Sequence, residues 1–126
     1  RRVYCAIEHY RSPFGYTLRR AEGAGSAEKV AVDLVESLVW LLGLDVDRMW
    51  REAQGVGITG RNRRGESVLV AFRECDVKGS GDWVMRLMAE HPSDRIYAND
   101  PAALAFPGAD RLEAIEAVFA SQFGTA

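Results

Sequence analysis

The sequence predicts an α+β domain in which helices cover one face of an antiparallel sheet. Three features of the 126-residue chain lead to this prediction: a long apolar helix at 26–42, a strongly apolar strand at 66–75, and the alternation of strand-like with helix-like segments. The composition, 48% hydrophobic and 27% charged, is typical of a globular protein. We therefore expect a single domain over residues 1–126.

The long helix organises the predicted fold. Ser26 is a good N-cap for it and Gly43 follows its last turn. Two adjacent apolar rows run along it, one of Val30, Leu34, Leu38 and Leu42 and the other of Ala31, Val35 and Val39. Two neighbouring rows make a stripe too wide for a surface helix that touches one neighbour. We expect this helix to lie across a sheet or between layers.

Five segments read as strands. Residues 3–10 and 14–20 alternate in polarity across a short loop and predict an antiparallel hairpin. Residues 56–60 form a weak, glycine-rich strand, 66–75 a strong one and 95–98 a short one. The centre of the strong strand, Val68 to Phe72, is apolar on both faces. This pattern indicates an interior strand, covered on both sides or by a helix and a partner chain.

Further helices are predicted between and after these strands. A short helix after Gly43 has Asp45 as its cap, and a helix near 81–90 ends at His91-Pro92. Asp100-Pro101 can start a single helical turn, and a last helix covers 111–123. The expected inward residues are Val46, Met49, Trp50 and Ala53 in the first, Trp83, Val84, Leu87 and Met88 in the second, and Leu112, Ile115, Val118 and Phe119 in the last.

The resulting element order is β-β-α-α-β-β-α-β-α. Without the second strand and the extra helices it becomes β-α-β-β-α-β, the ferredoxin-like arrangement with helices on one face of the sheet. In that arrangement strand 3–10 lies beside strand 66–75 and brings Cys5 near Cys75. The rival topology is a helix followed by three strands, a helix and a strand, as in restriction-nuclease-like folds.

Charge and cysteine content exclude some classes of protein. The net charge of −2 is too small to indicate nucleic acid or an acidic substrate by itself. The two cysteines show no CxxC or framework spacing, which favours a reduced, cytoplasmic protein. The longest uninterrupted apolar runs, such as Leu38 to Leu42, are far too short to cross a membrane, and no signal peptide is visible.

The sharpest local charge feature is the turn Arg61-Asn62-Arg63-Arg64-Gly65. Arg19 and Arg20 can add to it if the sheet brings the two hairpins together. Guanidinium groups suit phosphate and carboxylate, so this turn is a candidate anion or nucleic-acid site. The alternative is a solvated hairpin tip, which is the ordinary role of a charge run.

Two other sets of polar residues follow strands. Asp76 and Lys78 form an acid-x-lysine motif, in which the acid would bind Mg²⁺ and the lysine would orient water in a restriction-type nuclease. Such a site needs an acid on an earlier strand, where this chain offers Thr59. Asn99 and Asp100 are candidate crevice residues, although a turn and an N-cap also explain them.

The sequence favours a non-catalytic interaction or regulatory module that self-associates or binds a protein partner. The reason is that strand 66–75 and helix 26–42 offer more apolar faces than one small sheet can cover. The alternative is a nucleic-acid-directed domain, a degenerate restriction-nuclease-like fold that uses the turn 61–64. A small-molecule enzyme ranks third, because no set of nucleophile, base and orienting group is visible, and we expect no cofactor.

Overall fold

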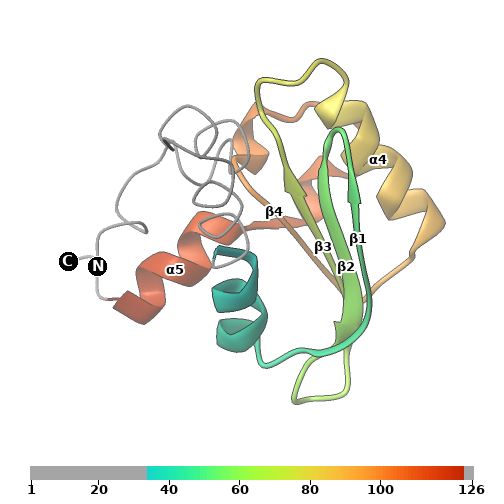
Figure 1. The fold of residues 1–126 in the computed structure, drawn as a ribbon. Coiled ribbons are helices and arrows are strands. Elements are labelled where there is room, and N and C mark those ends of the chain that lie inside the picture. The colour runs from blue at the N-terminus through green and yellow to red at the C-terminus, as the bar shows by residue number, and fades with distance from the viewer. Residues whose placement is uncertain (1–33, 124–126) are drawn as a thin grey trace.

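The computed structural model of the protein describes residues 34–123. A helix at 34–42 leads into a hairpin of β1 (Asp45–Glu52) and β2 (Gly55–Arg61), followed by β3 (Ser67–Arg73), helix α4 (Ser80–Glu90) and β4 (Arg95–Ala98). Short 3₁₀ turns at Pro101–Ala103 and Ala109–Arg111 precede β5 (Leu112–Ala114) and helix α5 (Ile115–Phe123). The chain is thus an α+β protein, as predicted (Figure 1).

The five strands form one mixed sheet in the order β1-β2-β3-β4-β5. The first three are antiparallel, whereas β4 runs parallel to β3 and β5 parallel to β4. The prediction of a purely antiparallel sheet is therefore wrong. The ferredoxin-like core is not confirmed, because β4 pairs directly with β3 and leaves no place for another strand between them. The strands expected at 3–10 and 14–20, with Cys5, lie outside the described residues.

The order of the described elements up to β4 is a helix, three antiparallel strands, a helix and a parallel strand. This is the order of the rival topology. The crossover through α4 explains the parallel pairing, since a parallel connection needs a crossover segment long enough to return the chain to the same end of the sheet.

Helices cover both faces of the sheet (Figure 1). On one face, Val68, Val70 and Phe72 of β3 pack with the helix 34–42 and α5. On the other, Leu69 and Ala71 pack against α4. The prediction that helices cover only one face is therefore wrong, because α4 packs on the face opposite to the other helices.

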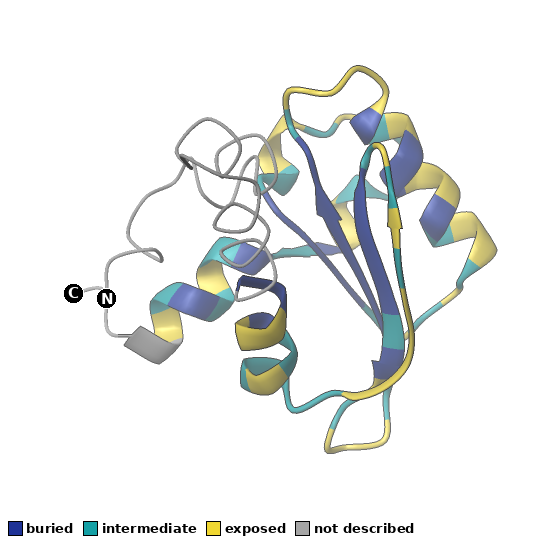
Figure 2. Ribbon diagram, in the orientation of Figure 1, coloured by how far each residue is buried: buried dark blue, intermediate teal, exposed yellow. Residues whose placement is uncertain are grey.

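The prediction that 66–75 is an interior strand is confirmed. Every residue from Val68 to Phe72 is buried, and the covering helices belong to the same chain (Figure 2). No second chain is needed to cover this strand. The apolar residues of β3 therefore give no reason to expect self-association. Any apolar surface that favours self-association must lie elsewhere on the molecule.

The helix 34–42 ends as the sequence predicts. Gly43 has φ +65°, its N–H donates to Trp40 O at 3.1 Å, and the Leu44 N–H donates to Val39 O at 3.1 Å. These two bonds form a Schellman motif, which requires a residue that tolerates the left-handed conformation. Leu34, Val35 and Leu38 are buried in the core, in agreement with the two apolar rows.

The short helix predicted after Gly43 is wrong, because residues 45–52 form β1. Met49 pairs with Ile58 and Trp50 with Gly57, so their side chains project to opposite faces of the sheet rather than along one helical face. Gly57 leaves the room that Trp50 fills: a Cβ on Gly57 would clash with the Trp50 ring. Contacts with the neighbouring strand β2 therefore decide the conformation of residues 45–52, although their apolar spacing also fits a short helix.

The last helix begins later than predicted. Residues 112–114 form β5 beside β4, and α5 starts at Ile115. Leu112 belongs to the core on the α4 side, whereas Ile115 and Phe119 belong to the opposite core. An apolar series that serves two cores resembled a single helical face in the sequence. Helix α4 and β4, by contrast, are confirmed almost to the residue.

Candidate functional site

A buried arginine joins three elements at the carboxyl ends of the parallel strands. Arg73, the last residue of β3, donates from Nε to Asn99 O at 3.2 Å and from Nη1 to Ser80 Oγ at 3.1 Å. Its Nη2 donates to Asp100 O at 3.0 Å and lies 3.7 Å from the Asp100 carboxylate. The buried charge is therefore both hydrogen-bonded and paired, as a buried guanidinium must be.

Asn99, the residue that follows β4, completes this cluster. Its Oδ1 accepts the Arg73 backbone N–H at 2.8 Å and its Nδ2 donates to Arg73 O at 2.9 Å. The side chain thus extends the hydrogen bonding between β3 and β4 beyond the last paired residues. Asn99 has an exposed fraction of 0%, so it fastens two strands and does not line a crevice. That candidate role is wrong for Asn99.

Asp100 has a mainly structural environment. It has φ +48° and forms the cap of the 3₁₀ turn at Pro101–Ala103, as the turn prediction expected. Its backbone N–H donates to both carboxylate oxygens of Glu116, at 2.8 and 3.1 Å. A non-glycine residue in the left-handed region is strained, and such hydrogen bonds offset the strain.

Burial raises the pKa of the Glu116 carboxyl above its usual value. Because the folded chain then favours the protonated form, the contribution of Glu116 to stability is largest at low pH and is lost as pH rises through the folded pKa.

We expect Glu116→Gln, which keeps an oxygen acceptor for the Asp100 N–H, to gain stability relative to the wild type as pH rises above the ordinary pKa of a glutamate carboxyl, about 4. Thermal unfolding midpoints at several pH values measure this difference. The exposed Glu36→Gln is the control. A Glu116→Gln effect that does not change with pH contradicts the argument.

The basic turn is held together by its own side chains. Asn62 Oδ1 accepts the backbone N–H groups of Arg64 and Glu66, at 3.0 and 2.9 Å, and Arg61 Nη1 donates to Gly65 O at 2.8 Å. Arg63 lies against the end of the helix 34–42, since a Cβ on Gly43 would lie 2.8 Å from its Nε. A cation there complements the helix dipole. Arg19 and Arg20 lie outside the described residues.

The structure separates the basic turn from Asp76 and Lys78. The turn precedes β3, while Asp76 and Lys78 are exposed in the loop after it, so about 20 Å of strand lies between them (Figure 1). Thr59 lies on β2 near the turn end, opposite Leu69. The acid, the lysine and the earlier-strand position of the proposed nuclease site are therefore not brought together.

Two observations from residues 34–123 bear on the wider classes of function. Among these residues, no three His, Cys, Asp or Glu side chains come close enough to hold a metal ion. No helix in the same part of the chain has the length and apolar character to cross a membrane.

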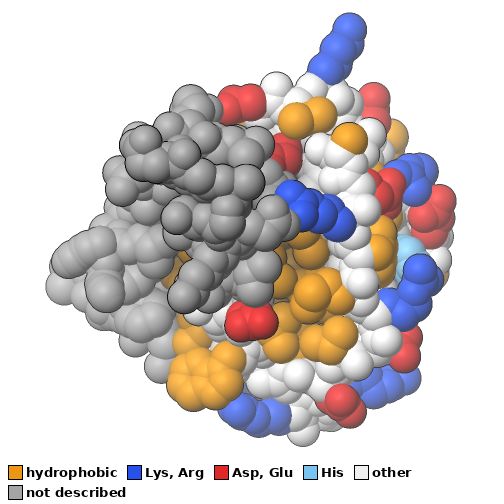
Figure 3. All heavy atoms as spheres, in the orientation of Figure 1, with side chains coloured by type: hydrophobic (Ala, Val, Ile, Leu, Met, Phe, Trp, Pro, Cys, Tyr) orange, Lys and Arg blue, Asp and Glu red, His pale blue; other side chains and the backbone are white. Residues whose placement is uncertain are grey.

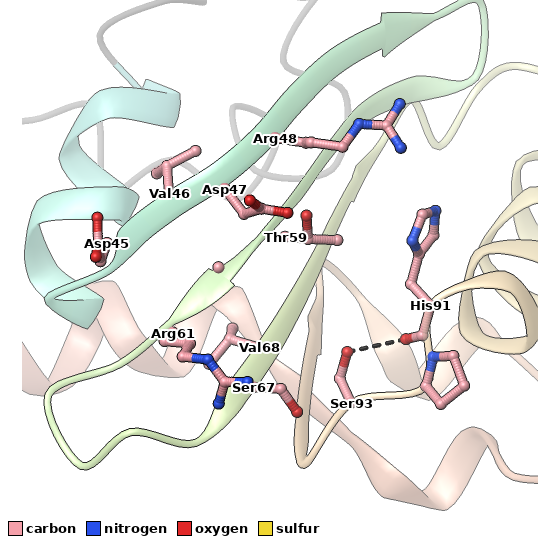
Figure 4. A pocket seen from close by; sticks show the side chains of 12 residues that line it. Asp45, Val46, Asp47, Arg48, Thr59, Arg61, Ser67, Val68, His91 and Ser93 are labelled. Carbon is pink, nitrogen blue, oxygen red and sulfur yellow. Dashed lines mark hydrogen bonds between the residues drawn. The ribbon is translucent and has the colours of Figure 1, made fainter.

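A hollow of about 600 Å³ lies beside the turn, on the α4 side of the sheet. Arg48 of β1 and Arg61 of β2 project on two sides of it, and His91, just after α4, on a third (Figure 4). Arg48 also stacks on Trp50, 5.1 Å from the ring centroid. Asp45 and Asp47 line the same hollow, so its charge is mixed.

An apolar groove of about 370 Å³ lies on the opposite side, between the helix 34–42 and the edge strand β1. Val39, Trp40, Leu44 and Met49 line it, with Glu36 and Arg63 at its margin. Trp40 is 71% exposed and Met49 is 49% exposed. Figure 3 shows hydrophobic side chains gathered on this face of the molecule. The groove is bordered by β1, which has no neighbouring strand on its outer side among the described residues.

Sequence reasoning missed this groove, although one signal was present. Trp40 belongs to neither apolar row of the long helix, so a helix buried through those rows leaves Trp40 outside the core. The exposure of Met49 was not foreseen because residues 45–52 were predicted to form a helix with Met49 on its inward face. Arg73 was missed because its partners Ser80 and Asn99 lie on other elements.

Comparisons with known proteins give no relative from which to transfer a function. No protein-family model matches the chain, and neither the curated proteins nor the solved structures contain a significant match.

Proposed function

We propose that this chain is a non-catalytic protein-interaction module whose docking surface is the edge of β1 together with the groove between β1 and the helix 34–42. The observation that carries the proposal is the pair Trp40 and Met49, two large hydrophobic side chains exposed along one groove. Tryptophan supplies much of the binding energy where proteins meet, and methionine adapts to irregular partners. The cytoplasmic setting favoured by the cysteines belongs to the same proposal.

The edge strand supports this role. An edge strand presents unpaired N–H and C=O groups that an added strand can use, while a neighbouring apolar groove binds its side chains. The other faces of the sheet supply no such surface, because the helices of the same chain cover them. The two most exposed large hydrophobic side chains of the described residues, Trp40 and Met49, therefore lie where backbone pairing is also possible.

A peptide library displayed on phage tests the proposal. Peptides enriched on the wild type are expected to bind Trp40→Ala about tenfold more weakly, because truncation of a central aromatic typically costs more than about 1 kcal/mol. Met85→Ala, on the opposite side of the sheet in α4, is the matched control, since Met85 is 41% exposed. Enriched peptides that bind both variants equally, or no enrichment at all, would contradict the docking surface.

A nucleic-acid-directed domain is the second candidate. It is favoured by the element order, which follows the rival topology, and by Arg48 and Arg61 on two sides of one hollow. The positions on β2 and β3 that face α4 include Gly57, Thr59 and Ala71, none of them acidic. This candidate is therefore a binding domain without hydrolysis.

Fluorescence anisotropy with duplex DNA and duplex RNA at two salt concentrations tests the second candidate. It predicts affinity that falls steeply with salt and is reduced in Arg48→Ser/Arg64→Ser but not in Lys78→Ser, the control at the far end of the sheet. Equal binding by the two variants, or no binding at low salt, contradicts it. Arg61 and Arg63 are left unchanged because they contact the turn and the helix end.

A further inference from the structure

We propose that the hollow on the α4 side of the sheet binds a free amino acid through both of its charged groups, with Arg48 contacting the carboxylate and Asp47 the ammonium group. The hollow lies on the face opposite to the groove of Trp40 and Met49, so this site goes beyond the proposed function and does not depend on it. Three observations carry the inference: a bulge that directs Asp47 into the hollow, a tryptophan that positions Arg48, and the mixed charge of the walls.

A bulge in β1 places an acid and a base side by side on one face of the sheet. Asp47 is skipped in the pairing of β1 with β2, and Arg48 lies directly opposite Thr59. In a regular strand Asp47 and Arg48 would project to opposite faces, whereas a bulge re-aims one of the side chains. Both residues line the hollow, and the Asp47 side chain is directed toward Thr59 (Figure 4).

Arg48 and His91 are positioned by the same tryptophan. The Arg48 guanidinium carbon lies 5.1 Å from the centroid of the Trp50 ring, and the centroid of the His91 ring also lies 5.1 Å from that of Trp50. Trp50 is itself held by a hydrogen bond of 2.8 Å from its Nε1 to Glu52. A guanidinium that stacks through its face keeps the N–H donors at its edge for a carboxylate. Arg48 is therefore held in place for an anionic group before a ligand binds.

The charges in the walls favour a ligand that carries both signs. Asp47 and Arg48 are exposed, and neither forms an ion pair within residues 34–123. Asp45, which pairs with Arg61 across the two strands, places a second acid and base at the hollow. A simple anion would meet an acid near each arginine, and a simple cation would meet an arginine near each acid. A zwitterion finds an opposite charge for each of its groups.

A free amino acid has the chemistry that these side chains can bind. Its carboxylate accepts two parallel N–H bonds from one guanidinium, as Arg48 can supply. Its ammonium group has three donors, for which the Asp47 carboxylate and the Thr59 hydroxyl are acceptors. The hollow, at about 600 Å³, is within the ordinary size range of small-molecule sites and leaves room for a side chain.

Calorimetric titration with the standard amino acids tests the site, followed by the N-acetyl and amide derivatives of the amino acid that binds most tightly. Each derivative is expected to bind the wild type about tenfold more weakly, because it lacks one charged group. Asp47→Asn weakens the amino acid about tenfold but not the N-acetyl derivative, which has no ammonium group. Arg48→Gln weakens the amino acid similarly but not the amide, which has no carboxylate. Asp76→Asn and Lys78→Gln, exposed in the loop after β3, are the matched controls without effect.

The absence of binding by every amino acid overturns the site. Variants that weaken the amino acid and both derivatives equally overturn the two assigned contacts. Inorganic phosphate or duplex DNA that binds more tightly to Asp47→Asn, without any binding of amino acids, also overturns the proposal and favours the anion-binding surface of the second candidate function. Peptides that depend on Trp40 test the docking surface on the other face, so either proposal can fail while the other stands.

Discussion

Leu69→Ala is expected to destabilise the chain by about 3 kcal/mol and Phe72→Ala by about 4 kcal/mol. Both residues lie on β3 with no exposed surface, Leu69 in the core against α4 and Phe72 in the core against the helix 34–42 and α5. Each truncation leaves a cavity in a closely packed layer. Because a domain of this size is stable by only about 5–15 kcal/mol, both losses are large. Urea unfolding measures them.

The comparison between the two variants matters more than either value. Side chains alternate between the two faces along a strand, so Leu69 and Phe72, three positions apart, project to opposite faces. A sheet covered on only one face would therefore tolerate one of these two changes. The expected result is that both destabilise, while Val77→Ala in the exposed loop after β3 changes stability by less than about 0.5 kcal/mol. A near-neutral effect at Leu69 or Phe72 contradicts the arrangement with helices on both faces.

Asn99→Leu is expected to cost about 3 kcal/mol, comparable to the loss of a core side chain. The replacement leaves the buried backbone N–H and C=O of Arg73 without their side-chain partner. An unsatisfied buried polar group loses its hydration without compensation, so size-matched leucine does not rescue it. Urea unfolding gives the free energy of unfolding, and amide exchange at Arg73 reports the lost bond directly.

Asn62→Leu provides the matched comparison. Asn62 also binds two backbone N–H groups, but it lies in a partly exposed turn where water can replace it. A smaller loss, of about 1 kcal/mol, is expected there. If Asn99→Leu is no more destabilising than Asn62→Leu, the buried clamp between β3 and β4 is not a major source of stability.

The parts of the fold that sequence predicted are those set by strong local patterns. The continuous apolar run in β3 and the inward face of α4 each had one periodicity and clear ends, and Gly43 marked the end of the long helix. Residues 45–52 and 112–114 were assigned to helices because their apolar spacing also fits a helix. Their strand state depends on pairing with β2 and with β4, which local sequence does not contain.

The candidate sites depended still more on tertiary placement. Asp76 and the basic turn are close in sequence, but β3 separates them in space. Asn99 reads as a loop residue in the sequence, yet the parallel pairing of β4 with β3 buries it against Arg73. The apolar groove exists only because the edge strand β1 lies beside the helix 34–42, and it could not be foreseen while residues 45–52 were predicted as a helix.

Amide hydrogen exchange along β1 tests most directly that this strand is the edge at which partners bind. Glu52 and Gly55 flank a two-residue loop and so exchange their backbone hydrogen bonds, which makes bonded and non-bonded pairs alternate along β1 and directs the Met49 amide away from β2. The Met49 amide is expected to exchange fast in the free protein and to become protected when a Trp40-dependent peptide is added. The Trp50 amide, which faces β2, should be protected throughout. A Met49 amide whose exchange does not respond to the peptide would contradict this role of β1.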